Sequence, residues 1–330
     1  MEKLIVSLSP HTHGGDSVER NMYGVAIALA PALAAALYFF GMGAAAVTLA
    51  SVASCIFFEW AIAKFILKTK PSITDGSALV TGLLLAFNLP SNMPLWTIAM
   101  GALVAIGVGK MSFGGIGSNI FNPALVGRCF LIVSFPAQMT SWPVAGQTWA
   151  YTDAATGATP LNLMKTAIKT GDTSWLEQLP STMEMLLGNY PQAFGAGSLG
   201  EICVPALLAG LAFMLWRGII TWHIPAAVVA TVAVISTALH LHNPAYAGPA
   251  AAVLSGGVIL GAVFMATDYT TSPMSKKGQI VYGIGIGTLT VAIRNWGSYP
   301  EGVSFAILMM NAFTPLINTY FKPRKFGQTR

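Results

Sequence analysis

Apolar runs long enough to cross a membrane recur along the whole chain, and this pattern constrains the fold more than any single motif does. A helix needs about 20 mainly apolar residues to cross the roughly 30 Å of bilayer hydrocarbon. Only 9% of the residues are charged, against about 25% in soluble domains, so the chain cannot cover a globule with polar surface. The sequence predicts an all-α integral membrane protein with about ten transmembrane helices, at residues 22–40, 45–66, 76–90, 93–109, 118–135, 201–219, 222–240, 247–266, 278–294 and 302–320.

The basic residues predict which side of the membrane each segment faces. Lys and Arg near the ends of membrane helices gather on the cytoplasmic side. If the N-terminus is cytoplasmic, three of the 17 Lys and Arg residues (Lys165, Lys169 and Arg294) fall on the outer side, Arg128 falls within a run, and the other 13 lie at cytoplasmic ends. Both termini are therefore predicted in the cytoplasm. The opening residues also lack the charged, apolar, cleavable order of a signal peptide.

This sidedness divides the chain into five parts. They are a cytoplasmic N-terminal segment (1–21), a first transmembrane half (22–135), an extracytoplasmic segment (136–200), a second transmembrane half (201–320) and a basic cytoplasmic tail (321–330). The net charge of +5 is typical of cytoplasmic loops next to a membrane and requires no nucleic-acid partner.

The two transmembrane halves resemble each other loosely. Each places a hydroxyl residue before glycine inside an apolar run, at Thr81-Gly82 and at Ser255-Gly256, and each approaches an asparagine and a proline later on, in 114–127 and in 301–317. Five spans in each half would give the two copies opposite orientations, the inverted-repeat arrangement of many transport folds. The alternative is that Gly and Ser are simply common in membrane helices. The third run is short and interrupted by the prolines of "FNLPSNMPLW", which predicts a broken or re-entrant segment.

Ionisable residues within or beside the spans are functional candidates, because charges are costly in lipid. Asp75 begins the third run and Asp268 ends the eighth, so the pair could serve a cation or proton path near the cytoplasmic face, or could merely cap helices. Glu59 and Lys64 are predicted to form an interfacial pair. Arg128 lies inside a span and requires an anionic partner, which could be a carboxylate, a phosphate or a flavin carbonyl.

The positions of the cysteines and histidines argue against several metal and haem sites. Cys55, Cys129 and Cys203 are far apart and form no C-x-x-C, so this chain alone cannot assemble an iron–sulfur or zinc site, although a cluster shared with another subunit is left open. The histidines lie outside the apolar interior of the spans, which disfavours a bis-histidine haem.

The stretch "DAATGATPLNL", residues 153–163, is rich in small residues and lies in the predicted extracytoplasmic segment. Thr159 followed by Pro160 is typical of a helix start, with threonine as N-cap and proline at the first helical position. The small residues before it would also let an enzyme or a ligand reach the threonine hydroxyl. Spacing alone favours the cap.

The same stretch resembles the D-x-x-[ST]-G-A-T motif of the family shared by the B subunit of the sodium-pumping NADH:quinone reductase and the D subunit of the Rnf ferredoxin:NAD oxidoreductase. In that family the last threonine is esterified through the phosphate of FMN. Thr159 occupies that position. Asp153, Thr156, Gly157 and Ala158 occupy the other motif positions, with threonine at 156 where serine is usual.

The resemblance extends over nearly the whole chain. "SPHTHGGDSVERNMYGVAIALAPA" near the start looks like the family's S-P-H opening, "FNPALVGR" (121–128) like its mid-chain signature, and "YPEGVSFAILMMNAFTPLI" (299–317) like its last helix. Because the S-P-H opening stands almost at residue 1, without a long extension before it, the resemblance favours the Rnf branch of the family, that of the D subunit.

The resemblance implies a fold and its cofactors. It implies ten helices in two inverted repeats of five, similar to urea channels, with covalent FMN on the extracytoplasmic side. A dedicated flavin transferase attaches this FMN outside the cytoplasm, which agrees with the side expected from the basic residues. Relatives also hold a noncovalent riboflavin in the membrane.

The resemblance also implies a multi-pass protein of the bacterial cytoplasmic (inner) membrane that relays electrons without completing the reaction alone. Its partners would be the A, B, C, E and G subunits of the Rnf complex, with ferredoxin and NAD reached through them and Na⁺ or H⁺ moved across the lipid bilayer. From the residues alone, a channel or secondary transporter without redox activity, or a scaffold without a cofactor, is the alternative.

Overall fold

The computed structural model describes residues 17–69, 72–191 and 193–322, which form helices joined by loops without a β-strand. Each of the ten predicted apolar runs contains helix. The all-α class is therefore confirmed. The S-P-H opening and most of the predicted basic tail lie outside the described residues.

The helices fall into two sets separated by a polar segment. The first set is α1 (Val18–Phe40), α2 (Met42–Ala61) with its π-helical extension η1 (Ile62–Leu67), α3 (Ser77–Phe87), α4 (Leu95–Gly107) and α5 (Pro123–Ser134). The second set is α10 (Val204–Trp216), α11 (His223–His242), α12 (Pro249–Leu254), α13 (Val258–Leu260) with the π-helical η4 (Gly261–Met265), α14 (Lys276–Trp296) and α15 (Val303–Tyr320).

Helix length and composition in the described residues identify a multi-pass membrane protein. Five stretches are apolar and long enough to cross a bilayer: α1, Met42–Leu67, Leu95–Phe113, α11 and α15. The helices α3, α5 and α10 are also apolar but shorter.

Each half contains an apolar run whose helix is cut short. In the third run, which was predicted to be broken or re-entrant, α3 ends at Phe87, before Pro90. The second interruption was not predicted: the run 247–266 is split after Leu254 into α12 and α13. Gly256 and Gly257 both have positive φ there, 62° and 63°, a conformation that residues with a Cβ adopt only at a cost.

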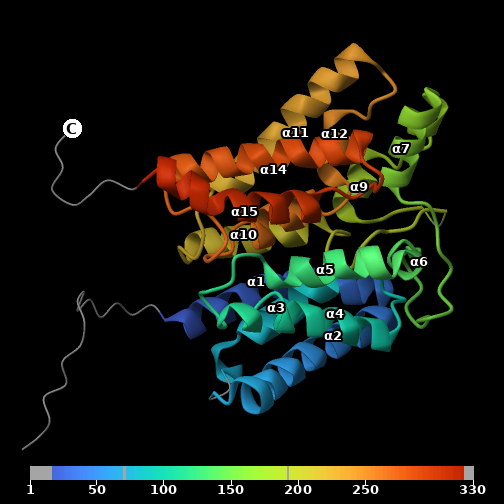
Figure 1. The fold of residues 1–330 in the computed structure, drawn as a ribbon. Helices are drawn as coiled ribbons and strands as arrows, with labels where there is room; N and C mark the ends of the chain where they lie inside the picture. The colour runs from blue at the N-terminus through green and yellow to red at the C-terminus, as the bar shows by residue number, and fades with distance from the viewer. Residues whose placement is uncertain (1–16, 70–71, 192, 323–330) are drawn as a thin grey trace, which may run out of the picture.

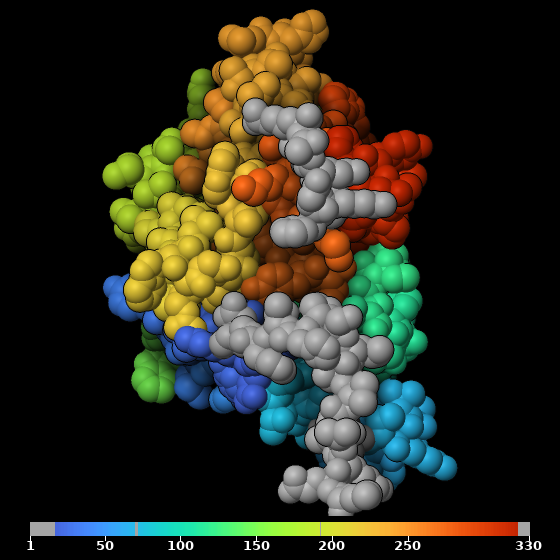
Figure 2. Space-filling view, turned by 90° about the vertical axis from the view of Figure 1, so that its left-hand side faces the viewer, coloured from blue at the N-terminus to red at the C-terminus, as the bar shows by residue number. Residues whose placement is uncertain are grey.

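The two halves have corresponding packing. In the first half α2 packs against α3 and α4, and α4 packs against α5; in the second half α11 packs against α12 and α14, and α14 packs against α15. Figure 1 shows the halves as two layers, and Figure 2 shows them end-on, with the first half below the second.

The halves meet through α1 and α10, which run antiparallel. Gly24, early in α1, contacts Ile219 just beyond the end of α10, whereas Gly210, in the middle of α10, lies against Ala28. A Cβ on Gly210 would approach the Ala28 carbonyl oxygen to 2.3 Å. Small residues thus allow the two backbones to approach closely, as is usual where helices associate in lipid.

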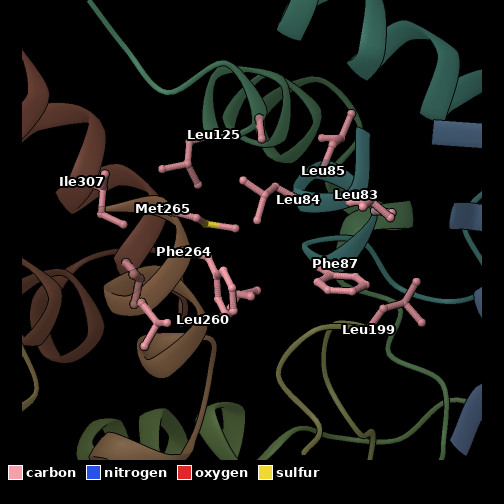
Figure 3. Packing of buried hydrophobic residues seen from close by; sticks show 14 of the residues in the cluster. Leu83, Leu84, Leu85, Phe87, Leu125, Leu199, Leu260, Phe264, Met265 and Ile307 are labelled. Atoms are coloured by element: carbon pink, nitrogen blue, oxygen red, sulfur yellow. The ribbon is translucent and has the colours of Figure 1, made fainter. Parts of the chain in front are cut away.

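The two interrupted helices face each other at the centre of the molecule. Figure 3 shows Leu84 and Phe87 of α3 opposite Phe264 and Met265 of η4, with Leu125 of α5 closing one side. All of these side chains are buried. Because lipid tails are as apolar as these residues, close van der Waals packing rather than water exclusion stabilises this core.

The polar segment covers one end of both halves, opposite the end where α1 begins and α15 ends (Figure 1). Its short helices are α6 (Pro136–Met139), α7 (Pro160–Thr170), α8 (Ser174–Glu177) and α9 (Thr182–Leu187). The segment then docks on the end of α3, where Gly200 N donates to Phe87 O at 2.9 Å. A Cβ on Gly200 would lie 2.5 Å from the Phe87 side chain, so this position requires glycine.

Candidate functional site

Thr159 is the N-cap of α7. Its backbone is extended (φ −77°, ψ 155°), and Pro160 takes the first helical position, as the Thr-Pro pair predicted. Its Oγ1 accepts the N–H of Asn162 at 3.3 Å, which is long for such a bond. The first-turn amides of this eleven-residue helix make its start favourable for an anion.

Backbone pairing on both sides holds the residues before Thr159. Thr156 pairs with Pro143 in an antiparallel bridge, and Ala158 pairs with Phe194 in a parallel one. Between them, a Cβ on Gly157 would lie 2.6 Å from a backbone nitrogen of the second partner segment. The motif therefore requires glycine at 157 for this close backbone approach.

Gln147 fixes the same loop, a role that no sequence pattern indicated. Its Nε2 donates to Ala155 O at 2.9 Å, and its Oε1 accepts the N–H of Ala155 at 2.7 Å. The side chain thus satisfies both polar groups of one peptide residue, as a neighbouring strand would. A glutamine in a polar loop has no distinctive spacing, so only the fold identifies it.

The motif side chains differ in exposure. Asp153, Thr156 and Ala158 are exposed, whereas Thr159 retains 8% of its accessible surface. Thr159 lines a small cavity of about 10 Å³, here called the Thr159 cleft. The other polar side chains that line this cleft are Tyr190, Glu201, Ser255 and Glu301.

Burial shifts the pKa of two titratable side chains of the polar segment. Lys165 Nζ donates to Gly297 O at 2.7 Å, and burial, with the charge of Lys169, lowers the pKa of Lys165. In the cleft itself, burial and the charge of Glu201 raise the pKa of Tyr190. The Tyr190 phenol therefore remains protonated at neutral pH and can donate a hydrogen bond.

Arg128 has the anionic partner that its burial requires, and that partner is a carboxylate. The guanidinium of Arg128 forms an ion pair with Glu301, and it also donates to Asn88 Oδ1. Arg128 lies on α5 and Glu301 just before α15, so the pair joins the two halves. Glu301 also lines the Thr159 cleft. Arg128 therefore contacts a side chain that lines the cleft.

Arg294, which charge counting placed on the outer side, is buried at the break in the second half. It donates to the carbonyl oxygens of Ala252, Ser255 and Gly256 at 2.6 to 2.8 Å. Carbonyl groups left unpaired where α12 ends are thereby satisfied. The cation stabilises the interruption from the end of α14.

A larger cavity of about 210 Å³ lies between the halves at the end where α1 begins, and Asp268 lines it. This Asp268 cavity is lined by residues of both halves, including Thr81, Lys110 and Asn122. Asp268 Oδ2 accepts the hydroxyls of Thr270 and Thr271 at 3.1 and 3.2 Å. Polar groups from two halves around one apolar-walled space are typical of a small-ligand site.

Asp75 does not line that cavity directly. Its Oδ1 accepts the N–H and the hydroxyl of Ser77, at 2.8 and 2.5 Å, at the start of α3. Ser77 and its neighbour Lys110 do line the cavity. The two predicted acids are thus at the same end of the molecule, with Asp75 behind Ser77 and Asp268 at the cavity wall.

The predicted Glu59–Lys64 pair is wrong. Glu59 binds Lys110 instead, Oε2 to Nζ at 2.7 Å, and both side chains are buried. Lys64 lies over the rings of Trp60 and Phe65. The reason is rotation along the helix: residues five apart do not share a face, whereas residues three or four apart do.

The residues around Thr159 fit a phosphate-linked group. The Oγ1 atom has one long hydrogen bond, the helix start favours an anion, and the residues just before it, Gly157 and Ala158, are small. Esterification would replace the hydroxyl's role as a cap, and the first-turn amides could then donate to phosphate oxygens.

The long apolar helices, with charged side chains buried between them, define a multi-pass membrane protein. A family model described as the NQR2, RnfD, RnfE family matches residues 5–327. The chain belongs to this family.

Curated relatives match over almost their full length. The chain is 43% identical to the D subunit of the Na(+)-translocating ferredoxin:NAD(+) oxidoreductase complex of Acetobacterium woodii, over 99% of this chain and 96% of that protein. It is 39% identical to the D subunit of the proton-translocating ferredoxin:NAD(+) oxidoreductase complex of Clostridium ljungdahlii, over 98% and 96%. It is 34% identical to the D subunit of the ion-translocating oxidoreductase complex of Escherichia coli O157:H7, over 98% and 99%.

Proposed function

We propose that this chain is the D subunit of a bacterial ion-translocating ferredoxin:NAD oxidoreductase complex and that it carries FMN esterified to Thr159. The observation that carries the proposal is the geometry of Thr159, whose hydroxyl stands at the start of α7 in a loop that matches the family's attachment motif. The names of the three relatives support the complex.

FMN would supply the electron-transfer chemistry, and the chain would fix its place. Gly157 and the paired backbone around it set the position of Thr159, and the α7 amides stabilise the phosphate charge. The ester tether limits how far the flavin can move from the segment and prevents its loss. The chain then acts as one relay in a longer electron path, with the A, B, C, E and G subunits as partners and ferredoxin and NAD reached through them.

The transmembrane arrangement belongs to the same proposal. We take the ten apolar helical segments as ten crossings in two inverted repeats, similar to urea channels. The corresponding packing of the two halves and the antiparallel contact of α1 with α10 support this arrangement. The chain would lie in the bacterial inner membrane with both termini cytoplasmic and residues 136–200 outside, where a flavin transferase can reach Thr159.

The Asp268 cavity suits the second, noncovalent flavin expected from the family resemblance. It has the mix of polar and apolar walls that suits an organic ring system. Asp268 at its wall, and Asp75 behind Ser77, are the proposed cytoplasmic entry for Na⁺ or H⁺. Replacing Asp268 with Asn should then reduce ion pumping more than electron transfer.

The attachment is tested by removing the hydroxyl while keeping the cap. Thr159→Asn retains a good N-cap side chain, whereas Thr159→Ala loses both functions and about 1 kcal/mol of stability. Both variants should insert and assemble but lack the flavin fluorescence that the wild-type chain shows on a denaturing gel.

Thr152→Ala is the matched control, because Thr152 is exposed in the same loop and should keep its fluorescence. Fluorescence that persists on the Thr159→Asn chain would refute the attachment site. A purified wild-type chain without any flavin absorbance would favour the alternative, a channel or secondary transporter without redox activity.

A further inference from the structure

Glu201 is a buried carboxylate with one oxygen that lacks a hydrogen bond among the described residues. The residue keeps 8% of its accessible surface. Its Oε1 accepts the N–H of Ser198 at 2.7 Å, but Oε2 has no hydrogen-bond partner among the described residues. Leaving an ionised oxygen buried and unpaired is costly, so such a group calls for an occupant beside it.

The backbone around Glu201 is shaped to admit its carboxylate. A Cβ on Gly197 would lie 1.8 Å from Oε1, and a Cβ on Gly257 would lie 3.2 Å from Oε2. Both glycines have positive φ, 77° and 63°. The carboxylate therefore occupies a space that exists only because two separate loops have glycine there.

Glu201 faces the point where the second half is interrupted. Gly257 is the N-cap of α13, and Ser255 is the C-cap of α12. In transport folds, interrupted helices supply the sites of coupling ions, because their loose ends place polar groups inside the membrane protein. Here two carbonyl oxygens of the break, those of Ser255 and Gly256, already bind Arg294, which leaves the side-chain oxygens for another cation.

The space available is that of one small occupant. The Thr159 cleft, which Glu201 lines with Ser255, Glu301 and Thr159, measures about 10 Å³, and a cavity of about this size holds roughly one water-sized particle. Its polar lining is dominated by oxygen atoms. Oxygen ligands suit hard cations.

Two guanidinium groups stabilise the charge of Glu201, but neither donates a hydrogen bond to Oε2. Arg128 is paired with Glu301, and Arg294 is bound to carbonyl groups, so their charges act on Glu201 without a direct hydrogen bond. A phosphate ester on Thr159 would add a further negative charge at the same cleft. Each negative charge at close range favours a cation there.

We infer that Glu201 Oε2 is the main ligand of a site for one small monovalent cation, Na⁺ or a proton, directly beside the flavin phosphate at Thr159. The inference rests on the proposed ion-translocating function. It identifies Glu201 as the group that would hold the ion at the Thr159 cleft. Ser255 Oγ and the Glu301 carboxylate complete its oxygen lining.

The test uses the purified whole complex with Glu201→Gln, and Glu177→Gln as the matched control. Glu177 is an exposed acid of the polar segment that precedes Glu201. The thermal unfolding midpoint is followed as Na⁺ replaces choline at constant ionic strength and pH. A bound ion raises the midpoint by mass action.

If the site takes Na⁺, wild type and Glu177→Gln gain stability with Na⁺, and Glu201→Gln loses that part of the gain. If it takes a proton, Na⁺ has no differential effect, and the infrared spectrum of wild type contains a protonated-carboxyl stretch that is missing from Glu201→Gln. Identical Na⁺ response and identical carboxyl bands in both proteins would overturn the inference.

Glu201→Asp covers the case in which Glu201→Gln fails to assemble. It keeps the charge but shortens its reach, so Na⁺ binding should weaken about tenfold without vanishing; unchanged binding would count against the site. Thr159→Asn separates the two proposals. Its fluorescence reports on the attachment, whereas its Na⁺ or proton binding should persist more weakly, because the phosphate charge is gone and Glu201 remains.

Discussion

Arg128 and Glu59 mark the limit of what the sequence could predict about single residues. A charge inside an apolar run indicates that it needs a partner, and the need was correctly predicted for Arg128. The identity of the partner was not, because Glu301 lies 173 positions away in the chain. For Glu59 the nearby Lys64 was chosen, whereas the actual partner, Lys110, is 51 positions away.

The Lys110–Glu59 pair gives a prediction at this scale. Lys110→Met should destabilise the protein by about 3–5 kcal/mol, because it leaves a buried carboxylate without its cation. The loss would appear as a lower unfolding midpoint of the detergent-solubilised protein.

The double variant Lys110→Met with Glu59→Met provides the control for that pair. It removes both charges and should recover much of the stability that the single variant loses. The single variant Glu59→Met completes the comparison. If the loss of stability in the double variant equals the sum of the losses in the two single variants, the pair is not energetically coupled.

The sequence predicted the motif around Thr159 but not the residues that hold the motif in place. The Thr-Pro cap and the motif positions are legible in local sequence. The clamp by Gln147 and the cleft formed with Glu201 and Glu301 depend on segments brought together by the fold, and a single glutamine or glutamate in a loop carries no spacing signal.

At the scale of helices, apolar length predicted where the elements lie but not where one of them breaks. Each predicted run contains helix, because backbone groups in lipid must be paired within the segment. The interruption at Gly256 and Gly257 was missed, since glycine is also common in uninterrupted membrane helices. The proline-marked interruption after α3 was predicted, because proline both lacks an N–H and clashes with the preceding turn.

Contact between α2 and α3 gives the second prediction. A Cβ on Gly82 would lie 2.7 Å from the Val52 Cα, and Ser51 Oγ donates to Gly82 O at 2.8 Å. Gly82→Ala should therefore push the helices apart and cost about 1–3 kcal/mol, measured as a lower unfolding midpoint.

Gly107→Ala is the matched comparison within the same half. Its new Cβ would meet only side-chain methyl groups, the nearer at 3.4 Å, and alanine favours helix, so stability should hold or rise slightly. Equal losses in both variants would show that backbone proximity at Gly82 is not the cause.

At the scale of the whole molecule, the predicted side of the membrane on which each loop lies can be measured directly. In a background without the native cysteines, Lys169→Cys and Lys277→Cys place single thiols on exposed positions at opposite predicted faces. A maleimide that cannot cross membranes should label Lys169→Cys in intact cells and Lys277→Cys only after the membrane is opened. The reverse pattern would contradict cytoplasmic termini.

The same arrangement explains why the halves were only loosely recognisable in the sequence. Corresponding helices keep corresponding partners, yet the details that hold each interruption differ. At the end of α3, Arg128 donates to the side-chain oxygen of Asn88, whereas Arg294 donates to backbone carbonyls between α12 and α13. Holding the two places through different acceptor groups leaves little residue identity between the two halves.

The backbone pairing around Gly157 has a consequence for the order of events in biogenesis. The loop takes its shape from residues 142–144, which are synthesised before it, and from residues 193–195, which are synthesised well after it. An enzyme that modifies Thr159 would therefore find a shaped acceptor only after the later strand-like segment has been exported and has joined the loop. Modification is expected as a late step, and chains halted in translocation before Gly195 should accumulate without it.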